Sequence, residues 1–172
     1  MEHLTFEMTK RPFEQLAVAI AFHSQMGESE KISTVTLAAT KENDGSDVTA
    51  GFLDSAIGSI PGGTATGGSV TTIVNTGLDH SNDGFKVDDI VVNITKGFKA
   101  QIKKLKTVTN SNDTLEFAEQ EIVSESGDDY TAQKGIAIIK AGAAGDRVRV
   151  NFQITTNLGN KLQGDLIVHV IS

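Results

Sequence analysis

Alternating apolar and polar residues near the end of the chain predict a β-hairpin. In residues 148–154 every second side chain is apolar, which places these side chains on one face of a strand. Residues 155–160 supply the Asn and Gly of a turn, and the alternation resumes over 162–170. We expect Phe152 to lie in the core between these strands and their neighbours.

The pattern near the start of the chain fits two structures. Leu16, Val18, Ile20 and Phe22 alternate with alanines, as in a strand, while Pro12 ahead of them is typical of the first turn of a helix. Periodicity alone leaves both alternatives open. Residues 31–39 predict a strand, and the polar residues 40–49 predict a loop.

The middle of the chain predicts a second β-domain. Residues 59–68, SIPGGTATGG, contain four glycines and a proline and mark a boundary or tight turns. Short strands are expected after this stretch, over 69–75, 89–94, 100–109 and 114–117, and a further strand is expected later, over 135–140. We therefore predict an all-β fold in which residues 1–58 and 121–172 form one sandwich and residues 59–120 form an inserted domain.

Composition and charge exclude several classes of function. The 172 residues contain no cysteine, which excludes disulfides and thiolate metal sites. With 22 acidic and 15 basic residues the net charge is -7, the opposite sign to a protein that coats nucleic acid. The apolar run ending at Phe22 is too short to span a membrane and lacks the cleavage site of a signal peptide. We expect neither nucleic acid nor membrane as partner.

The candidate chemistry is sparse. No phosphate-binding loop or G-x-S-x-G motif occurs, so we expect no enzyme and no cofactor. Asp79, Ser81 and Asp83 carry oxygen atoms at alternate positions before Gly84, like the start of a calcium loop. Ile90 stands where such a loop has its final Glu, and the same residues make ordinary turns. A plain turn is the favoured interpretation, with calcium as the alternative.

A basic cluster is the other local feature. It consists of Lys96, Lys99, Lys103, Lys104 and Lys106. Such lysines often keep exposed strands soluble and prevent strand edges from aggregating. They could instead attract an acidic protein partner, which the scarcity of nearby aromatic residues favours over nucleic acid.

The two ends of the chain resemble a known group of proteins. The segment KRPFEQLAVAI from Lys10, followed by Ile32-Ser33-Thr34, is similar to the opening of small Ig-like proteins of tailed bacteriophages. The segment GDRVRV from Gly145, TTNLGN from Thr155 and the final strand are similar to their last third. The resemblance to this fibre–tail adaptor family covers residues 10–55 and 121–172. It implies an Ig-like sandwich and favours a strand over residues 16–22.

The middle resembles a small β-module of phage tail and fibre proteins. The similarity rests on GTATGGSVTTIV from Gly63, on residues 84–91 and 98–105, and on TLEF from Thr114. Asp88 stands where the module often has glycine, and the usual aromatic residue before that strand is missing. This resemblance implies a small β-barrel-like insert.

Together the resemblances imply a non-enzymatic structural component of a phage virion. We expect it in the tail, neck or fibre attachment region, as a symmetric homo-oligomer bound to other virion proteins. A capsid decoration protein is an alternative, and a secreted carbohydrate-binding or adhesion module is an alternative from another class. The low Trp and Tyr content counts against sugar binding, which uses aromatic stacking platforms.

Overall fold

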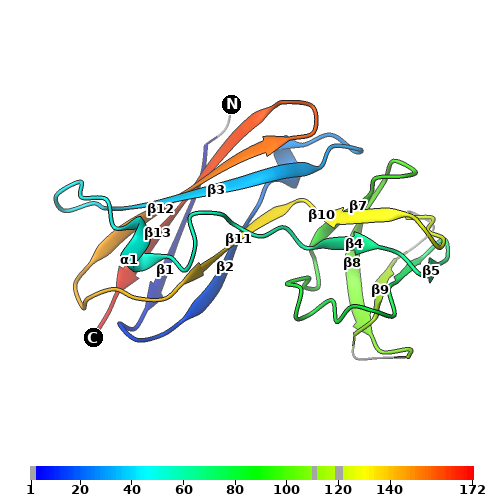
Figure 1. Cartoon of the computed structure of the whole chain (residues 1–172), viewed down its shortest axis with the longest axis horizontal. Helices are drawn as coiled ribbons and strands as arrows, with labels where there is room; N and C mark the ends of the chain where they lie inside the picture. Colours follow the sequence, from blue (N-terminus) through cyan, green and yellow to red (C-terminus); the bar gives the residue numbers. More distant parts are fainter. Residues whose placement is uncertain (1–2, 110–111, 119–121) are drawn as a thin grey trace. The chain divides into compact units, whose positions relative to one another are not determined.

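The structure is a computed structural model that describes residues 3–109, 112–118 and 122–172. Its described residues form two compact units (Figure 1). The first, the sandwich unit, comprises Met1–Ile20, Ile32–Ser59 and Gly135–Ser172, and the second, the inserted unit, comprises Ala21–Lys31 and Ile60–Lys134. The all-β class is confirmed, since the described helical segments are only η1 (His23–Gln25) and α1 (Thr49–Phe52).

One sheet of the sandwich unit joins the two ends of the chain. Its strand order is β1-β13-β12-β3, with bounds β1 Leu4–Lys10, β13 Lys161–Val170, β12 Arg147–Thr156 and β3 Ile32–Lys41. Strands β12 and β13 form the predicted hairpin, with Val148 opposite Val168. Strand β1 pairs parallel to β13, with Leu4 opposite Gly164.

The second layer of the sandwich is smaller. It contains β2 (Leu16–Ala21) and β11 (Lys134–Ile139), which form a two-stranded sheet. The segment 53–59 runs alongside, with isolated bridges from Leu53 to Ile139 and from Ser59 to Ile136. The strand alternative for residues 16–22 is therefore confirmed over Leu16–Ala21.

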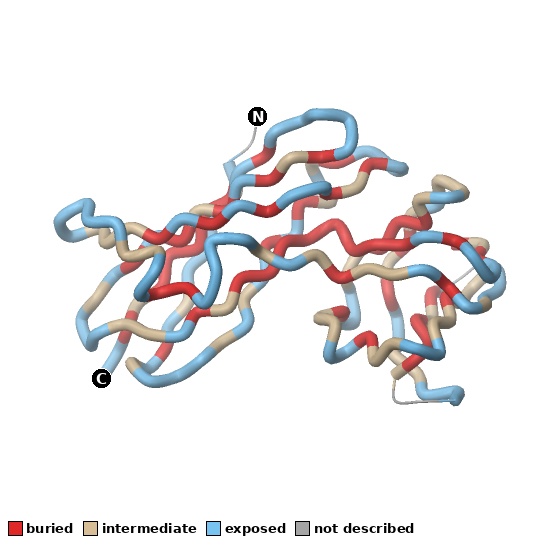
Figure 2. The backbone as a smooth tube through the Cα atoms, viewed as in Figure 1, coloured by how far each residue is buried: buried red, intermediate tan, exposed pale blue. Residues whose placement is uncertain are grey.

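The core of the sandwich unit follows the predicted alternation. Val148, Val150, Phe152 and Ile154 on β12 are all buried, while Arg147 before them and Arg149 among them are exposed. Figure 2 shows buried and exposed positions alternating along strands of this unit. Phe152 stands opposite Gly164 on β13 and Leu37 on β3. The predicted core position of Phe152 is confirmed.

The inserted unit is built on one seven-stranded sheet. Its order is β4-β10-β7-β8-β9-β6-β5. The bounds are β4 Gly62–Thr64, β5 Gly67–Gly68, β6 Thr72–Val74, β7 Ile90–Asn93, β8 Phe98–Lys106, β9 Thr114–Phe117 and β10 Asp129–Ala132. The two edge strands, β4 and β5, are separated by only two residues along the chain, so the sheet must curl until its edges approach. No ladder closes it among the described strands, and a closed barrel is not formed.

The boundaries of the insert differ from the predicted ones. Residues 122–134 were expected in the sandwich, but β10 pairs with β4 and β7 and belongs to the inserted unit. Residues Ala21–Lys31 also join it, because the Gln133 side chain donates hydrogen bonds to the carbonyls of Gly27 and Glu30. The predicted loop at residues 40–49 begins later, since β3 continues to Lys41.

Asp88 adopts a backbone conformation that favours glycine. Its φ is 74°, in the left-handed region that costs L-residues roughly 1–2 kcal/mol. Its exposed side chain precedes β7, and its amide donates to the carbonyl of Ile102. We expect Asp88→Gly to retain or raise the free energy of unfolding by up to about 1 kcal/mol, and Asp88→Val to lower it by about 1–2 kcal/mol. Urea unfolding of both variants checks this, and equal loss in the two would contradict it.

Candidate functional site

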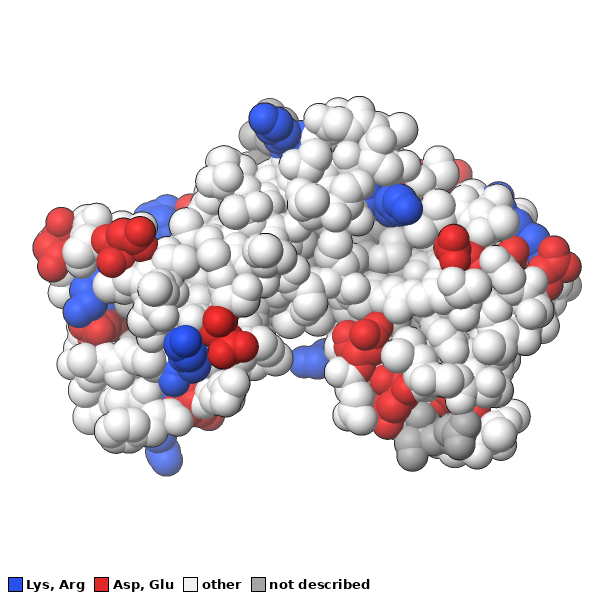
Figure 3. All heavy atoms as spheres, in the orientation of Figure 1, with Lys and Arg blue, Asp and Glu red and all other residues white. Residues whose placement is uncertain are grey.

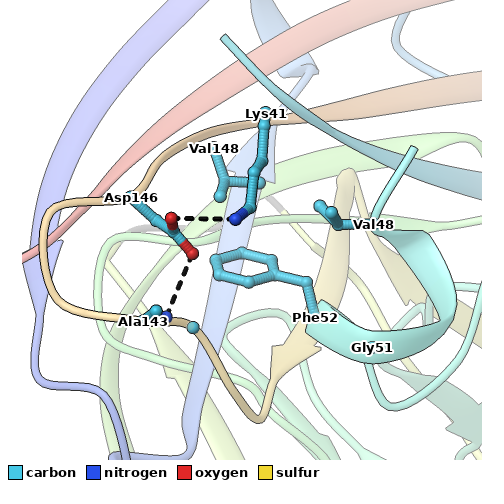
Figure 4. A pocket seen from close by; sticks show the side chains of 8 residues that line it. Lys41, Val48, Gly51, Phe52, Ala143, Asp146 and Val148 are labelled. Atoms are coloured by element: carbon cyan, nitrogen blue, oxygen red, sulfur yellow. Dashed lines mark hydrogen bonds and ion pairs between the residues drawn. The ribbon is translucent and has the colours of Figure 1, made fainter. Parts of the chain in front are cut away.

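A cavity of about 320 Å³ lies within the sandwich unit. It is formed by α1, the end of β3 and the turn before β12 (Figure 4). Its lining residues are Lys41, Val48, Gly51, Phe52, Gly142, Ala143, Asp146 and Val148. Most of these carry apolar side chains or none, so the cavity favours an apolar group.

Backbone contacts fix the walls of this cavity. The amide of Ala39 on β3 donates to the Thr49 hydroxyl at 2.8 Å, which attaches α1 to the sheet. The amide of Lys140 donates to the carbonyl of Phe52 at 3.0 Å. Gly142 has a φ of 137°, and a Cβ there would lie 2.8 Å from Val170 and 3.1 Å from the Phe52 ring. Only glycine therefore lets the turn approach the Phe52 ring this closely.

One ion pair lies at the edge of the cavity. Lys41 Nζ is 3.0 Å from Asp146 Oδ1, and Asp146 Oδ2 accepts a hydrogen bond from the amide of Ala143 at 3.0 Å (Figure 4). Burial alone would raise the pKa of Asp146, but the donors Lys41 and Ala143 lower it below its usual value. Asp146 is therefore ionised at neutral pH, and its charge is offset by Lys41. The arrangement can bind an apolar group beside a fixed ion pair.

The five lysines of the basic cluster occupy β8 and the turn before it, but most are engaged locally. Lys96 pairs with Glu125 at 2.9 Å and Asp128 at 3.4 Å, and Lys106 pairs with Glu116. Lys103 Nζ donates to the side-chain oxygen of Gln101 at 2.8 Å. Lys104, opposite Glu116 on β9, is exposed.

Lys99 has a structural contact. Its Nζ donates to the carbonyls of His23 at 3.1 Å and Met26 at 3.2 Å, and burial lowers its pKa. The cluster therefore does not present five unpaired charges together. Figure 3 likewise shows acidic and basic side chains scattered among uncharged ones on the face that it draws. Binding of a partner by these lysines stays a prediction.

The candidate calcium residues form a turn. Asp79 Oδ1 accepts hydrogen bonds from the amide and hydroxyl of Ser81, and the Ser81 hydroxyl is the main cause that lowers the pKa of Asp79. Asp83 Oδ2 instead accepts from the amide of Gly62 at 3.0 Å. The two carboxylates bind different protein donors, as the turn interpretation predicts. Among the described residues, no three His, Cys, Asp or Glu side chains are grouped as metal ligands.

A buried hydrogen-bond chain lies beside this turn. His80 is 0% exposed; its Nδ1 is 2.7 Å from the carbonyl oxygen of Asn112 and its Nε2 is 2.7 Å from the Tyr130 hydroxyl. A carbonyl oxygen only accepts, so Nδ1 carries the proton and Nε2 accepts from Tyr130. The Asn75 amide in turn donates to the Tyr130 oxygen at 3.2 Å. The Tyr130 hydroxyl can donate its proton to His80 Nε2 only while the His80 ring is neutral.

The fold should lose stability in mild acid because of His80. Burial lowers its pKa in the folded state, so below about pH 6.5, its ordinary value, the unfolded chain binds a proton that the folded chain does not. We expect about 1 kcal/mol less stability at pH 5.5 than at pH 7.5 from this residue. Urea unfolding at the two pH values should show the loss in the wild type and a smaller loss in His80→Gln. Equal losses would contradict the assignment.

A charged network covers the outer face of the four-stranded sheet. The buried Asp165 on β13 accepts from Asn151 Nδ2 and Arg149 Nη1, both at 2.7 Å, and lies 2.9 Å from His3 Nε2. Burial alone would raise the pKa of Asp165, but these three donors lower it. Arg149 also pairs with Glu42. The network cross-links the sheet and is satisfied internally.

Pattern reasoning from the sequence missed the cavity. Its residues come from three separated segments that only the fold brings together. The available signal was weak: Phe52 is the one aromatic residue in a polar stretch, and Gly142 and Gly145 flank a turn before Asp146. Neither pattern specifies a cavity without the pairing of β3 with β12.

In the part of the chain that the structure describes, no helix has the length and apolar character needed to cross a membrane. Comparison with protein-family models, with curated proteins and with solved structures finds no match for this chain.

Proposed function

We propose that this chain is a non-enzymatic structural component of a tailed-phage virion that binds neighbouring subunits in the tail, neck or fibre attachment region. The observation that carries the proposal is the arrangement of the chain. Its first and last strands, β1 and β13, pair in one sheet, while residues 60–134 fold as a separate unit. The resemblance to phage Ig-like proteins implies an interrupted sandwich, and this arrangement supports that interpretation.

The surface also supports a binding role. Large apolar side chains are exposed at two turns, with Phe13 at 98% and Leu158 at 68%, and Ile57, which forms an isolated bridge to Thr36, is 75% exposed. Aromatic side chains such as Phe13 are enriched at the buried centres of protein interfaces. In a symmetric particle, individually modest contacts of this kind are repeated in every copy and add up.

Particles from the lysate of the host organism test the proposal. The particles would be purified on a density gradient and labelled with gold-conjugated antibody against the recombinant chain. Label at the tail or neck supports the proposal, and label over the head surface would favour the capsid decoration alternative. Chain found only in the soluble fraction, with no labelled particle, would overturn the virion role.

A further inference from the structure

The connection between β6 and β7 is fastened to the inserted unit at a few points. Residues 76–87, which we call the strap, contain neither strand nor helix, and within them only His80 and Phe85 are buried. The Asp83 carboxylate adds a hydrogen bond from the amide of Gly62. Because so few contacts hold the strap, its release costs less free energy than unfolding the seven-stranded sheet.

Three elements of the inserted unit meet at the His80 ring. The carbonyl oxygen of Asn112, before β9, accepts hydrogen bonds from the His80 amide at 3.1 Å and from its ring Nδ1 at 2.7 Å. On the other side of the ring, Nε2 accepts from the Tyr130 hydroxyl of β10 at 2.7 Å. The Phe85 ring completes the cluster, with its centroid 5.3 Å from that of His80 and 5.9 Å from that of Tyr130. His80 therefore links the strap to β10 and to the segment before β9.

This arrangement does not accommodate a protonated His80 ring. The second ring proton, at Nε2, would point at the Tyr130 oxygen, and the Tyr130 hydroxyl would lose the acceptor of its own proton. The ring would also carry a positive charge at a position that is 0% exposed, which is costly without a hydrogen-bonded partner of opposite charge.

The charged groups around the ring do not supply that partner. Both ring nitrogens are engaged elsewhere, and the oxygens of Asp79, Asp83 and Asp113 accept hydrogen bonds from other protein groups. Burial lowers the pKa of His80 by more than the neighbouring carbonyl and these three carboxylates raise it. Tyr130, whose pKa burial raises to about 12, stays neutral.

We propose that residues 76–87 form an acid-released strap, which detaches from the inserted unit when His80 takes up a proton, while the seven-stranded sheet stays folded. Detachment places the charged ring in water, next to Asp79 and Asp83 of the same segment, and exposes Phe85 and Tyr130 to solvent. The inserted unit thereby responds to pH through one short segment. This inference goes beyond the proposed function and does not depend on it.

Hydrogen exchange of the full chain, followed by NMR at pH 7.5 and 5.5, tests the strap. The amides of His80 and Phe85 donate hydrogen bonds in the closed form, and their protection should be at least about tenfold lower than that of the amides of β8. After correction for the pH dependence of the chemical exchange step, their protection should fall about tenfold from pH 7.5 to 5.5, because only the detached form binds a proton below about pH 6.5. Dilute urea should change it little, since release of the strap exposes little surface.

Two histidine variants make the test specific. His80→Gln keeps a polar side chain that does not titrate, so the protection of its strap should be the same at both pH values. His169→Gln, which removes a half-exposed histidine of the sandwich unit, should respond to pH as the wild type does.

Three results would overturn the inference. Strap amides as strongly protected as those of β8, and equally sensitive to urea, would show that His80 is released only when the whole unit unfolds. Strap protection that does not change between the two pH values would show that protonation of His80 does not release the strap. A fall with pH that persists in His80→Gln would assign the response to another group. If that variant does not fold, the pH and urea dependence of the wild type decides.

Discussion

Replacing Phe152 with alanine is expected to lower the free energy of unfolding of the sandwich unit by about 3–5 kcal/mol. The ring is 0% exposed and lies on the central strand β12, opposite Gly164 and Leu37. Truncation removes apolar contacts and leaves a cavity that paired strands on both sides cannot close. Urea or thermal unfolding of the full chain measures the loss.

Two controls make this prediction specific. Phe152→Leu keeps much of the volume and should cost less than half as much, while Leu158→Ala, at an exposed turn, should change the stability by no more than about 0.5 kcal/mol. A loss below about 1 kcal/mol for Phe152→Ala would show that the hairpin does not pack as described.

Replacing Lys10 with methionine should have the second largest effect, a loss of about 2–4 kcal/mol. The side chain keeps its apolar stem, but the carbonyls of Arg11, Pro12 and Ala141 lose their common donor. Burial lowers the pKa of Lys10, while the charge of Glu14 opposes that shift.

Lys161→Met is the matched control for this variant. Lys161 begins β13 and is exposed, so its replacement should be nearly neutral. Urea unfolding at pH 7 compares the two variants with the wild type. Equal stability of Lys10→Met and Lys161→Met would contradict the role assigned to the buried ammonium group.

The sequence predicts those strands of the sandwich that pair with a neighbour close by in the chain. The alternation of residues 148–154 and 162–170 specified β12 and β13, because a hairpin needs only a short turn and a period of two. Strand β1 was not predicted, although Leu4, Phe6 and Met8 alternate with polar residues. Its partner is the last strand of the chain, and no local pattern reports such a distant pairing.

The boundary of the insert was wrong for a related reason. The chain passes from β10 into β11 through Gln133 alone, so no Gly- or Pro-rich linker marks the change of unit. At the candidate sites, the residue types of the turn at Asp79 and of the basic cluster were visible in the sequence. Their local partners, such as Gly62 for Asp83 and the carbonyl of His23 for Lys99, depend on tertiary structure.

The pairing of Leu4 with Gly164 has a consequence for synthesis on the ribosome. Strand β1 must wait, unpaired, until β13 has been translated, whereas most of residues 60–134 can fold as soon as they emerge. Sheets closed by such distant segments form slowly, and nascent strands left open in the meantime are prone to aggregation. Yield in the cell should therefore depend on how long the amino-terminal segment is shielded.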